Sequence, residues 1–325
     1  MNVNRREFLS LGGGLFAAAA LPGCGPEPSP DPFAARGNFE RLNLAYATVE
    51  VGAQRPFSIL HISDTHLTAA YPHEDAKKQE LRRIRTQTFG GHQEEALRDT
   101  LAWAKTNVDW VLHTGDFIDW ISEANLDLVR KYFGAGMFGC LGNHEFSPYM
   151  WLEKTTEDEA NKDADGKRQL LSSTFPFDVS VNSTLVNGVN FVTLDDVYGT
   201  VTAQQATRVA EEAKKGLPFV LCMHVPFYTD KIWRVNRKFW TAAAQHGQPN
   251  FYRAAAVPEA EGDCRAQRTD PVTRDFIAYL KGEPLLKAVL AGHLHISVED
   301  RFSPTAMEYV VGGNFLFHGR EILFT

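Results

Sequence analysis

Five apolar runs of about strand length each end in a short block of aspartate, asparagine or histidine. The blocks read ISDTHL, HTGDFID, LGNHEF, LCMHVP and AGHLHI, and they contain Asp64, His66, Asp116, Asn143, His144, His224, His293 and His295. Carboxylate, amide and imidazole groups are ligands that divalent first-row metals accept. Eight such groups are more than one ion needs, so the pattern predicts five strand ends that converge on two adjacent ions.

Glycine directly precedes three of these blocks' ligand positions, at Gly115, Gly142 and Gly292. Without a β-carbon, glycine allows close backbone approach and sharp changes of direction. We therefore expect the chain to turn sharply out of each strand and to pass close to the ligands.

The spacing of apolar residues elsewhere predicts alternating strands and helices early in the chain and paired strands late. Strand-like runs cover residues 42–51, 57–62, 108–113, 137–141, 184–194, 219–223 and 286–290, and helix-like patterns cover residues 93–105, 123–133, 202–215 and 271–282. Residues 297–324 alternate like two or three antiparallel strands with a turn at residues 312–314. These elements predict an α/β (α+β) fold of two mixed sheets flanked by helices.

Local signals mark three of these elements. Asn187-Gly188 is a strong hairpin signal. Thr202 with Gln205 forms a capping box, and Asp270 before a proline marks a second helix start.

Two segments do not fit a regular pattern. Residues 153–169 are highly charged and suggest an exposed helix or lid. Residues 230–268 are interpreted as a long irregular insertion that contains Trp233, Phe239, Trp240, Phe251 and Tyr252. A loop of this length is usually functional, and its aromatic residues would either contact a substrate or form a small hydrophobic cluster over the site.

Composition limits the class of protein. The 325 residues carry a formal net charge of −7, with 33 Lys and Arg against 40 Asp and Glu. A nucleic-acid partner is therefore not expected, because such proteins show a basic surplus. The four cysteines lack a metal-type C-x-x-C spacing and do not form a disulfide-dense scaffold. No sequence feature indicates an oligomeric state.

Residues 1–24 are interpreted as an export signal and are excluded from the fold. Arg5 and Arg6, followed by Phe8 and Leu9, resemble a twin-arginine signal, and the apolar stretch is too short to span a membrane. Residues 21–24 resemble a bacterial lipobox, which would lipidate Cys24.

The alternative to lipidation at Cys24 is ordinary signal-peptidase cleavage near residues 18–20. Residues 25–39 form a proline-rich linker, and residues 40–325 form the globular domain. We expect an exported, periplasmic or extracytoplasmic protein that contacts the membrane only through a possible lipid anchor at Cys24.

In order, the five blocks read D-x-H, G-D-x-x-D, G-N-H-E, H and G-H-x-H. This set resembles the calcineurin-like metallophosphoesterase superfamily over about residues 57–296. The resemblance implies a four-layer β-sandwich of two mixed sheets flanked by helices. It also implies a hydrolase that acts on a small phosphoester, either a monoester or a diester.

The same resemblance implies a role for each ligand candidate. One ion would be held by Asp64, His66 and His295, the other by Asn143, His224 and His293, and the shared carboxylate would be Asp116. The two divalent ions would be Mn, Fe or Zn, which suit carboxylate and imidazole ligands. A metal-bridging hydroxide would then attack phosphorus in line.

His144 is expected to remain off the metals and to face the phosphate, where it would either stabilise charge or protonate the leaving oxygen. Asp119 stands where related phosphatases place the carboxylate that orients this histidine, although a helix cap is the alternative. Phosphoprotein phosphatases carry an arginine directly after that aspartate, whereas this chain has Trp120. The difference argues against a protein phosphatase. We expect Glu145 to have a structural hydrogen-bonding role.

The other histidines have simpler interpretations. His61 and His113 precede the blocks within strands and are expected to pack near the site, while His73, His92, His246 and His318 are expected at the surface or the substrate edge. The alternative to an enzyme is a non-catalytic metal-binding scaffold or surface lipoprotein on the same fold. Such a protein would be expected to lack at least one ligand, and none is missing here.

Overall fold

The computed structural model describes residues 41–325 except for residues 135, 147–165, 198, 246–266 and 268. The described residues belong to one folded unit, Asn38–Thr325. The expected signal at residues 1–24 and linker at residues 25–39 lie outside the described residues. Within the described part of the chain, no helix has the length and apolar character needed to cross a membrane.

The first sheet contains five strands in the order β1-β11-β2-β3-β4. Their bounds are β1 Asn43–Val49, β2 Phe57–Ile62, β3 Trp110–Thr114, β4 Met137–Cys140 and β11 His318–Phe324. Strands β2, β3 and β4 run parallel, and β11 joins the sheet antiparallel to β2. The carboxyl ends of β2, β3 and β4 therefore lie at one edge of the sheet.

The second sheet contains six strands in the order β5-β6-β7-β8-β10-β9. Their bounds are β5 Val181–Val186, β6 Val189–Leu194, β7 Phe219–Cys222, β8 Leu286–Ala291, β9 Val298–Arg301 and β10 Met307–Val310. Strands β6, β7 and β8 are parallel, whereas β5 and β6 form an antiparallel hairpin. The predicted turn at Asn187-Gly188 is confirmed, with φ of 46° and 86°, as a type I′ turn requires.

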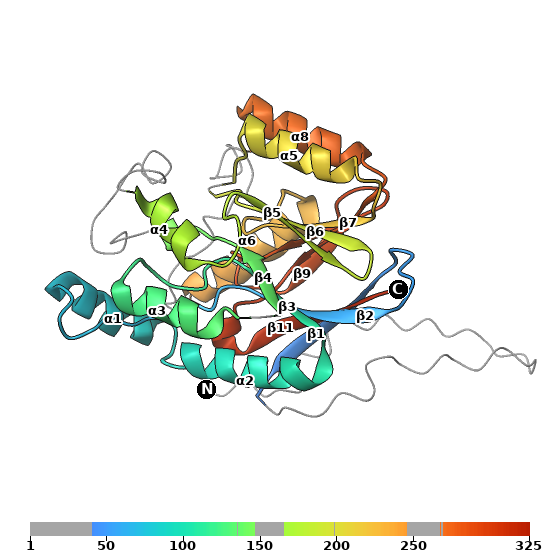
Figure 1. Ribbon diagram of the computed structural model, residues 1–325. Helices are drawn as coiled ribbons and strands as arrows, with labels where there is room; N and C mark the ends of the chain where they lie inside the picture. The colour runs from blue at the N-terminus through green and yellow to red at the C-terminus, as the bar shows by residue number, and fades with distance from the viewer. Residues whose placement is uncertain (1–40, 135, 147–165, 198, 246–266, 268) are drawn as a thin grey trace, which may run out of the picture. The chain divides into compact units, whose positions relative to one another are not determined.

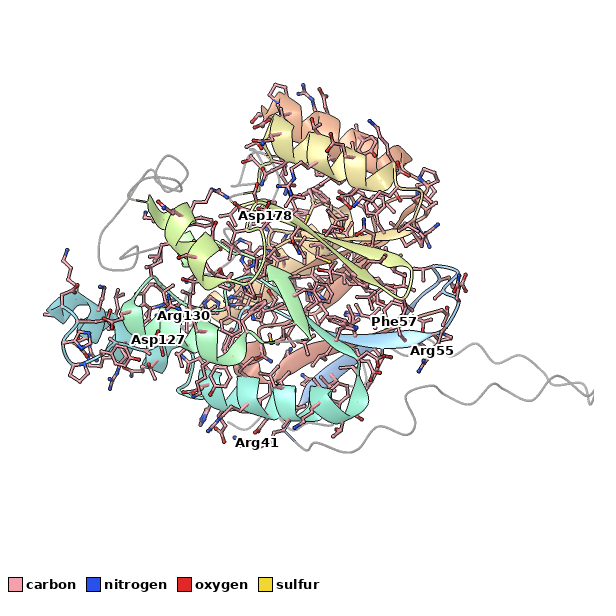
Figure 2. All side chains as sticks on the ribbon, in the orientation of Figure 1. Arg41, Arg55, Phe57, Asp127, Arg130 and Asp178 are labelled. Atoms are coloured by element: carbon pink, nitrogen blue, oxygen red, sulfur yellow. The ribbon has the colours of Figure 1, made fainter. Side chains whose placement is uncertain are left out.

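The two sheets pack face to face through one apolar layer. Alternate residues of each strand enter this layer, as the twofold periodicity of strands requires: Phe57 and Ile59 from β2 meet Phe191 from β6 and Leu290 from β8. The ring of Phe57, which is labelled in Figure 2, stacks on that of Phe324 with centroids 5.1 Å apart. This layer fixes the positions of the strands whose ends carry the ligands.

Helices cover the outer face of each sheet (Figure 1). Helices α2 (Gln93–Asn107) and α3 (Glu123–Tyr132) pack on the first sheet, and α5 (Ala203–Ala213) and α8 (Pro271–Gly282) pack on the second. The predicted arrangement of two mixed sheets flanked by helices is therefore confirmed. The predicted helix starts are also present, since Thr202 and Gln205 form a capping box and Asp270 caps α8.

Helix α6 (Asp230–Gln245) corrects the interpretation of residues 230–268 as irregular. Its inner side buries Ile232, Asn236 and Trp240, which recur every four residues. Because a polar asparagine stands in the middle of this stripe, the apolar period of the helix is not evident from the sequence. Phe251 and Tyr252 lie outside the described residues.

Two further segments differ from expectation. Helix α1 (Ala76–Thr88) was not predicted, and α4 (Lys167–Thr174) covers only the end of the charged stretch, most of which lies outside the described residues. The last strands do not form one antiparallel set, because β10 lies in the second sheet and β11 in the first. Asn314 lies between β10 and β11, where the chain passes from the second sheet to the first. Its backbone N–H donates to the Ser63 carbonyl, and its side chain donates to the hydroxyl of Thr100.

Candidate metal centre

The structure brings together all eight metal-capable residues of the sequence, namely the seven ligand candidates and His144. They follow the carboxyl ends of β2, β3, β4, β7 and β8 by two or three residues, except His66, His144 and His295, which lie slightly further along the same loops. Backbone hydrogen bonds connect these loops, from Asp64 to the Gly115 carbonyl and from His66 to the Asp116 carbonyl. The five blocks thus form one buried cluster between the ends of the two sheets.

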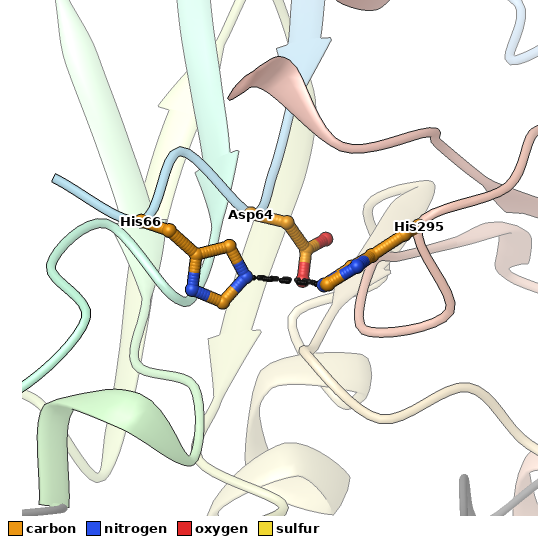
Figure 3. Close-up of side chains that lie close together, drawn as sticks. All are labelled: Asp64, His66 and His295. Carbon is orange, nitrogen blue, oxygen red and sulfur yellow. Dashed lines mark hydrogen bonds and ion pairs between the residues drawn. The ribbon is translucent and has the colours of Figure 1, made fainter. Parts of the chain in front are cut away.

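The first ligand group contains Asp64, His66 and His295 (Figure 3). Oδ1 of Asp64 lies 3.3 Å from Nε2 of His295 and 3.9 Å from Nε2 of His66. The two imidazole Nε2 atoms are 3.1 Å apart. Three donor atoms from two sheets therefore face a common point.

The second ligand group contains Asp116, His224 and His293. Nε2 of His224 lies 3.2 Å from Nδ1 of His293, 3.2 Å from Oδ1 of Asn143 and 3.3 Å from Oδ2 of Asp116. The Nδ1 atom of His224 lies 2.7 Å from the Thr114 carbonyl and donates to it, which leaves Nε2 unprotonated in the neutral ring. Asn143 therefore belongs to this group.

Asp116 lies between the two groups. Its Oδ2 atom is 3.3 Å from Nε2 of His224 and 3.8 Å from Nε2 of His66. Its other oxygen accepts the backbone N–H of His144 at 2.9 Å, which holds the carboxylate in this orientation. One oxygen of Asp116 thus faces ligand candidates of both groups, a position from which a carboxylate can bridge two ions.

His144 and Asp119 form a separate contact beside the ligands. Nδ1 of His144 lies 2.8 Å from Oδ1 of Asp119, and its Nε2 faces Oδ2 of Asp116 at 3.8 Å. Nδ1 of His66 also lies 2.9 Å from the same Asp119 oxygen. Because a carboxylate can only accept, both imidazoles donate from Nδ1 and present Nε2 to the centre. Asp119 therefore orients both the ligand candidate His66 and His144.

A family model described as calcineurin-like phosphoesterase matches residues 57–297, which is most of the chain. The chain belongs to this family. It is a metal-dependent phosphoesterase, and its family and its clusters of histidine and aspartate indicate a dinuclear centre of divalent ions. Comparison with curated proteins gives no match.

Several solved structures are similar to this phosphoesterase at low sequence identity. A dimetal phosphatase from Danio rerio is 13% identical with a TM-score of 0.43, over 82% of this chain and 91% of that one. Purple acid phosphatase PPD1 from yellow lupin (Lupinus luteus) is 13% identical with a TM-score of 0.42, over 80% and 44%. The calcineurin-like phosphoesterase YfkN from Bacillus subtilis is 13% identical with a TM-score of 0.36, over 80% and 82%. The family assignment depends on the family model.

Arg85 is a residue of the phosphoesterase site that sequence reasoning missed. It comes from α1, is buried, and donates from Nε to Oδ2 of Asp119 at 2.6 Å and from a terminal nitrogen to Oδ1 at 3.1 Å. Trp120, which stands where protein phosphatases carry arginine, is fully buried. No local signal identifies Arg85, because it reaches Asp119 only through the packing of a helix that was not predicted.

Two buried carboxylates accept hydrogen bonds from the backbone of the ligand loops. Glu145 accepts the backbone N–H groups of Asp116 at 2.9 Å, Gly142 at 2.7 Å and Ile118 at 3.1 Å. This confirms its expected structural role. Asp196, which sequence reasoning missed, accepts the N–H of His224 at 3.0 Å. Both carboxylates hold the backbone that carries ligands.

The ligand positions adopt a backbone conformation that L-residues rarely occupy. Among the described non-glycine residues with positive φ, five of seven are ligand candidates: Asp64, His66, Asp116, His293 and His295, with φ between 49° and 68°. Such conformations cost free energy and persist where the surrounding structure imposes them, most often at functional sites. The expected close approach at glycine is also present, since a β-carbon on Gly115 would lie 2.6 Å from Nδ1 of His224.

Burial and the neighbouring carboxylates shift the pKa values of the histidines in the cluster in different directions. Burial lowers the pKa of His66 to about 4 and that of His293 to about 3, so both rings are neutral near pH 7 and able to coordinate. Burial alone would lower the pKa of His224, but the Asp116 carboxylate outweighs it and raises the pKa to about 10. Burial would likewise lower the pKa of His144, yet Asp116 and Asp119 raise it. A proton on His144 is therefore favoured.

The donor atoms fit divalent ions. Ligand atoms that each lie about 2.0–2.2 Å from one ion are about 3–4 Å apart, and the distances within both groups run from 3.1 to 3.9 Å. Oδ1 of Asp64 is fully buried and accepts no hydrogen bond from the described residues. A buried carboxylate oxygen without a donor is expected where a cation provides its charge partner.

Other histidines support the cluster or lie away from it. His61 and His113 are buried, and their Nε2 atoms lie 2.8 Å from the hydroxyls of Thr114 and Thr65, as expected for residues that pack beside the ligand loops. The side chains of His73 and His92 are 64% and 60% exposed, which agrees with the expected surface positions. His246 lies outside the described residues.

Proposed function

We propose that this phosphoesterase cleaves a small phosphoester by in-line attack of an activated water, with His144 as the general acid. The convergence of the seven ligand candidates and His144, with Asp116 facing both groups, is the observation that supports this proposal. When bound, two divalent ions supply the activated water and neutralise the phosphoryl oxygens. The remaining chemistry belongs to residues of the chain.

His144 has the geometry and charge of a proton donor. Asp119 accepts from its Nδ1, so the imidazolium presents Nε2–H towards the centre. The carboxylates of Asp116 and Asp119 raise the pKa of His144, which favours the protonated ring. A donor placed this way can protonate the leaving oxygen, a contribution that is typically about 10²–10⁴-fold in rate.

The donor set favours Mn, Fe or Zn. Four imidazole nitrogens stand beside two carboxylates and one amide oxygen in the two ligand groups. Mg and Ca prefer oxygen ligands alone, whereas mixed nitrogen and oxygen ligands suit the first-row transition metals and zinc.

The test is turnover of two model substrates by protein with measured metal content. The purified protein is loaded with Mn²⁺, Fe²⁺ or Zn²⁺ and assayed on p-nitrophenyl phosphate and bis-p-nitrophenyl phosphate. The proposal expects turnover of at least one, and the ratio between them assigns the preference for monoesters or diesters. Two bound ions per chain with no turnover of either substrate would instead support the non-catalytic scaffold.

We also propose that the protein is exported through its twin-arginine motif and is lipid-anchored at Cys24. Support comes from the sequence of residues 1–24. The test is export of the full chain and of the Arg5→Lys, Arg6→Lys variant, with labelling by a radioactive fatty acid. Export that persists in the variant contradicts the first proposal. Fatty-acid labelling that persists in Cys24→Ala contradicts the second.

A further inference from the structure

We infer that the outer face of α6 docks this phosphoesterase on an anionic phospholipid surface. The helix carries four cations, Lys231, Arg234, Arg237 and Lys238, against the single acid Asp230. The whole chain, by contrast, has a net charge of −7. A local basic excess on an acidic protein is a feature that attracts anionic surfaces.

Three of these cations form a row that faces outward. Lys231, Arg234 and Lys238 are exposed, and their spacing of three and four residues places them on one face of the helix. Arg234 and Lys238 form no ion pair with a carboxylate of the described residues. Lys231 lies beside Asp300, whose carboxylate accepts the Lys231 backbone N–H at 3.3 Å and whose pKa the Lys231 charge helps to lower. The charges of Arg234 and Lys238 are therefore not paired within the described part of the molecule.

Two exposed apolar side chains lie beside this row. Val235 is 38% exposed and Phe239 is 45% exposed, and among the described phenylalanines only Phe239 is exposed. A helix that presents lysine and arginine together with phenylalanine matches the composition of helices that lie in the headgroup region of a bilayer. Phospholipid is favoured over nucleic acid because an aliphatic valine and an edge phenylalanine gain free energy from burial among acyl chains.

The opposite side of α6 is fixed to the protein beside the metal centre. Ile232 packs with Leu294 and Ile296, and Nε1 of Trp240 donates to the Leu294 carbonyl at 3.2 Å. The ring of Trp240 lies 6.2 Å from that of His295, a ligand candidate. A surface that binds α6 is therefore held close to the centre. If the protein cleaves phosphoesters as proposed above, its substrates would lie in or near that surface. This consequence rests on the proposed function, whereas the docking of α6 does not.

The test is binding of the full chain to vesicles of phosphatidylcholine with and without phosphatidylglycerol. The test variant combines Lys231→Glu, Arg234→Glu and Lys238→Glu. The control combines Arg55→Glu, Lys105→Glu and Lys214→Glu, which makes the same charge change at exposed positions outside α6 (Arg55 is labelled in Figure 2). Binding through residues 1–40 is common to all three proteins, so the measured quantity is the increase in partitioning caused by phosphatidylglycerol.

We expect the wild type and the control to show this increase and to lose it in high salt. Each cation near an anionic surface contributes about fivefold in affinity, so the α6 variant should lose at least about 100-fold. Phe239→Ser should lose about three- to tenfold. Hydrogen exchange of the α6 amides should slow when the wild type binds. Circular dichroism and thermal unfolding check that each variant is folded.

Several results would overturn the inference. An α6 variant that binds phosphatidylglycerol vesicles as well as the control does would remove α6 from the interaction. Wild-type protein that shows no increase with phosphatidylglycerol but binds a single-stranded RNA oligonucleotide through the same three cations would identify a nucleic-acid surface. Wild-type protein that dimerises in solution through the same three cations, without an increase on vesicles, would identify a contact between copies of this chain. None of these assays requires catalytic activity, so they are independent of the turnover test.

Discussion

The two ligand groups of this phosphoesterase are held in place by different kinds of interaction. The group of Asp64, His66 and His295 is braced by side-chain charge, because Asp119 accepts from His66 and is itself paired with Arg85. The group of Asp116, His224, His293 and Asn143 is braced through the backbone, by Glu145, Asp196 and the Thr114 carbonyl. Backbone hydrogen bonds hold the loops of both groups, and His66 of the first group depends in addition on one buried ion pair.

This difference has a functional meaning. His144 shares Asp119 with the first group, so the proton donor and one ion's ligands depend on the same buried carboxylate. A change in the Arg85–Asp119 pair should therefore alter both metal binding and proton transfer. A change in Glu145 or Asp196 should act first on folding. The following variants test this contrast, in order of decreasing expected effect.

Asp116→Asn should have the largest effect, because the carboxylate of Asp116 faces ligand candidates of both groups. The variant loses a charge between the ligands while its backbone N–H still donates to Glu145. We expect turnover below detection and fewer than two ions per chain, with the protein still folded. Turnover, metal analysis and thermal unfolding provide the three measurements. Two tightly bound ions in this variant would show that Asp116 does not bridge them.

His144→Ala should lower kcat by about 10²–10⁴-fold while both ions remain bound. Its Nδ1 lies 2.8 Å from Oδ1 of Asp119, and it belongs to neither of the two ligand groups described above. The decrease in kcat should be smallest for a substrate with a good leaving group, since such a group needs little protonation. Loss of an ion from His144→Ala would reassign His144 as a ligand.

Arg85→Met should destabilise the folded protein by about 3–5 kcal/mol, because it leaves the Asp119 carboxylate buried without its cation. We also expect weaker binding of one ion. Arg82→Met is the matched control, since Arg82 lies on the same helix and is exposed. Arg85→Lys should recover part of the stability, but not the two-point contact. If Arg85→Met matches the control in stability and metal affinity, side-chain charge does not brace the first group.

Asp196→Asn should change the pH dependence of stability in the metal-free protein. Burial raises the pKa of Asp196 from its ordinary value near 4 to about 7, so between these pH values the folded protein holds a proton that the unfolded chain has lost. This contribution to stability is therefore lost as pH rises towards 7, by about 2–4 kcal/mol. Asparagine keeps an acceptor for the His224 N–H and cannot ionise. The free energy of unfolding of the variant relative to wild type, measured by urea unfolding, should increase as pH rises from 5 to 8. Parallel plots of this free energy against pH for the two proteins would contradict the prediction.

The sequence predicted those features that local patterns encode. The five ligand blocks, the Asn187-Gly188 hairpin and the Thr202 capping box depend on adjacent residues, and the structure places each where its pattern indicates. The two-sheet arrangement followed from the order of strands and helices. Which sheet each late strand joins was not encoded locally, because a crossing such as that at Asn314 depends on contacts with distant loops.

The features that were missed depend on packing between distant segments. Arg85 and Asp119 are 34 residues apart and meet only because α1 packs against the site. Asn236 interrupts the apolar stripe of α6 and hides its helical period. The positive φ of Asp64 and His66 could not be foreseen either, since neither residue type requires it.

Anomalous diffraction from crystals of the Mn²⁺- or Zn²⁺-loaded protein would test the dinuclear centre most directly. Two peaks on either side of Oδ2 of Asp116, one beside His66 and His295 and the other beside His224 and His293, are the predicted result. A single peak, or two peaks of which only one contacts Asp116, would contradict it.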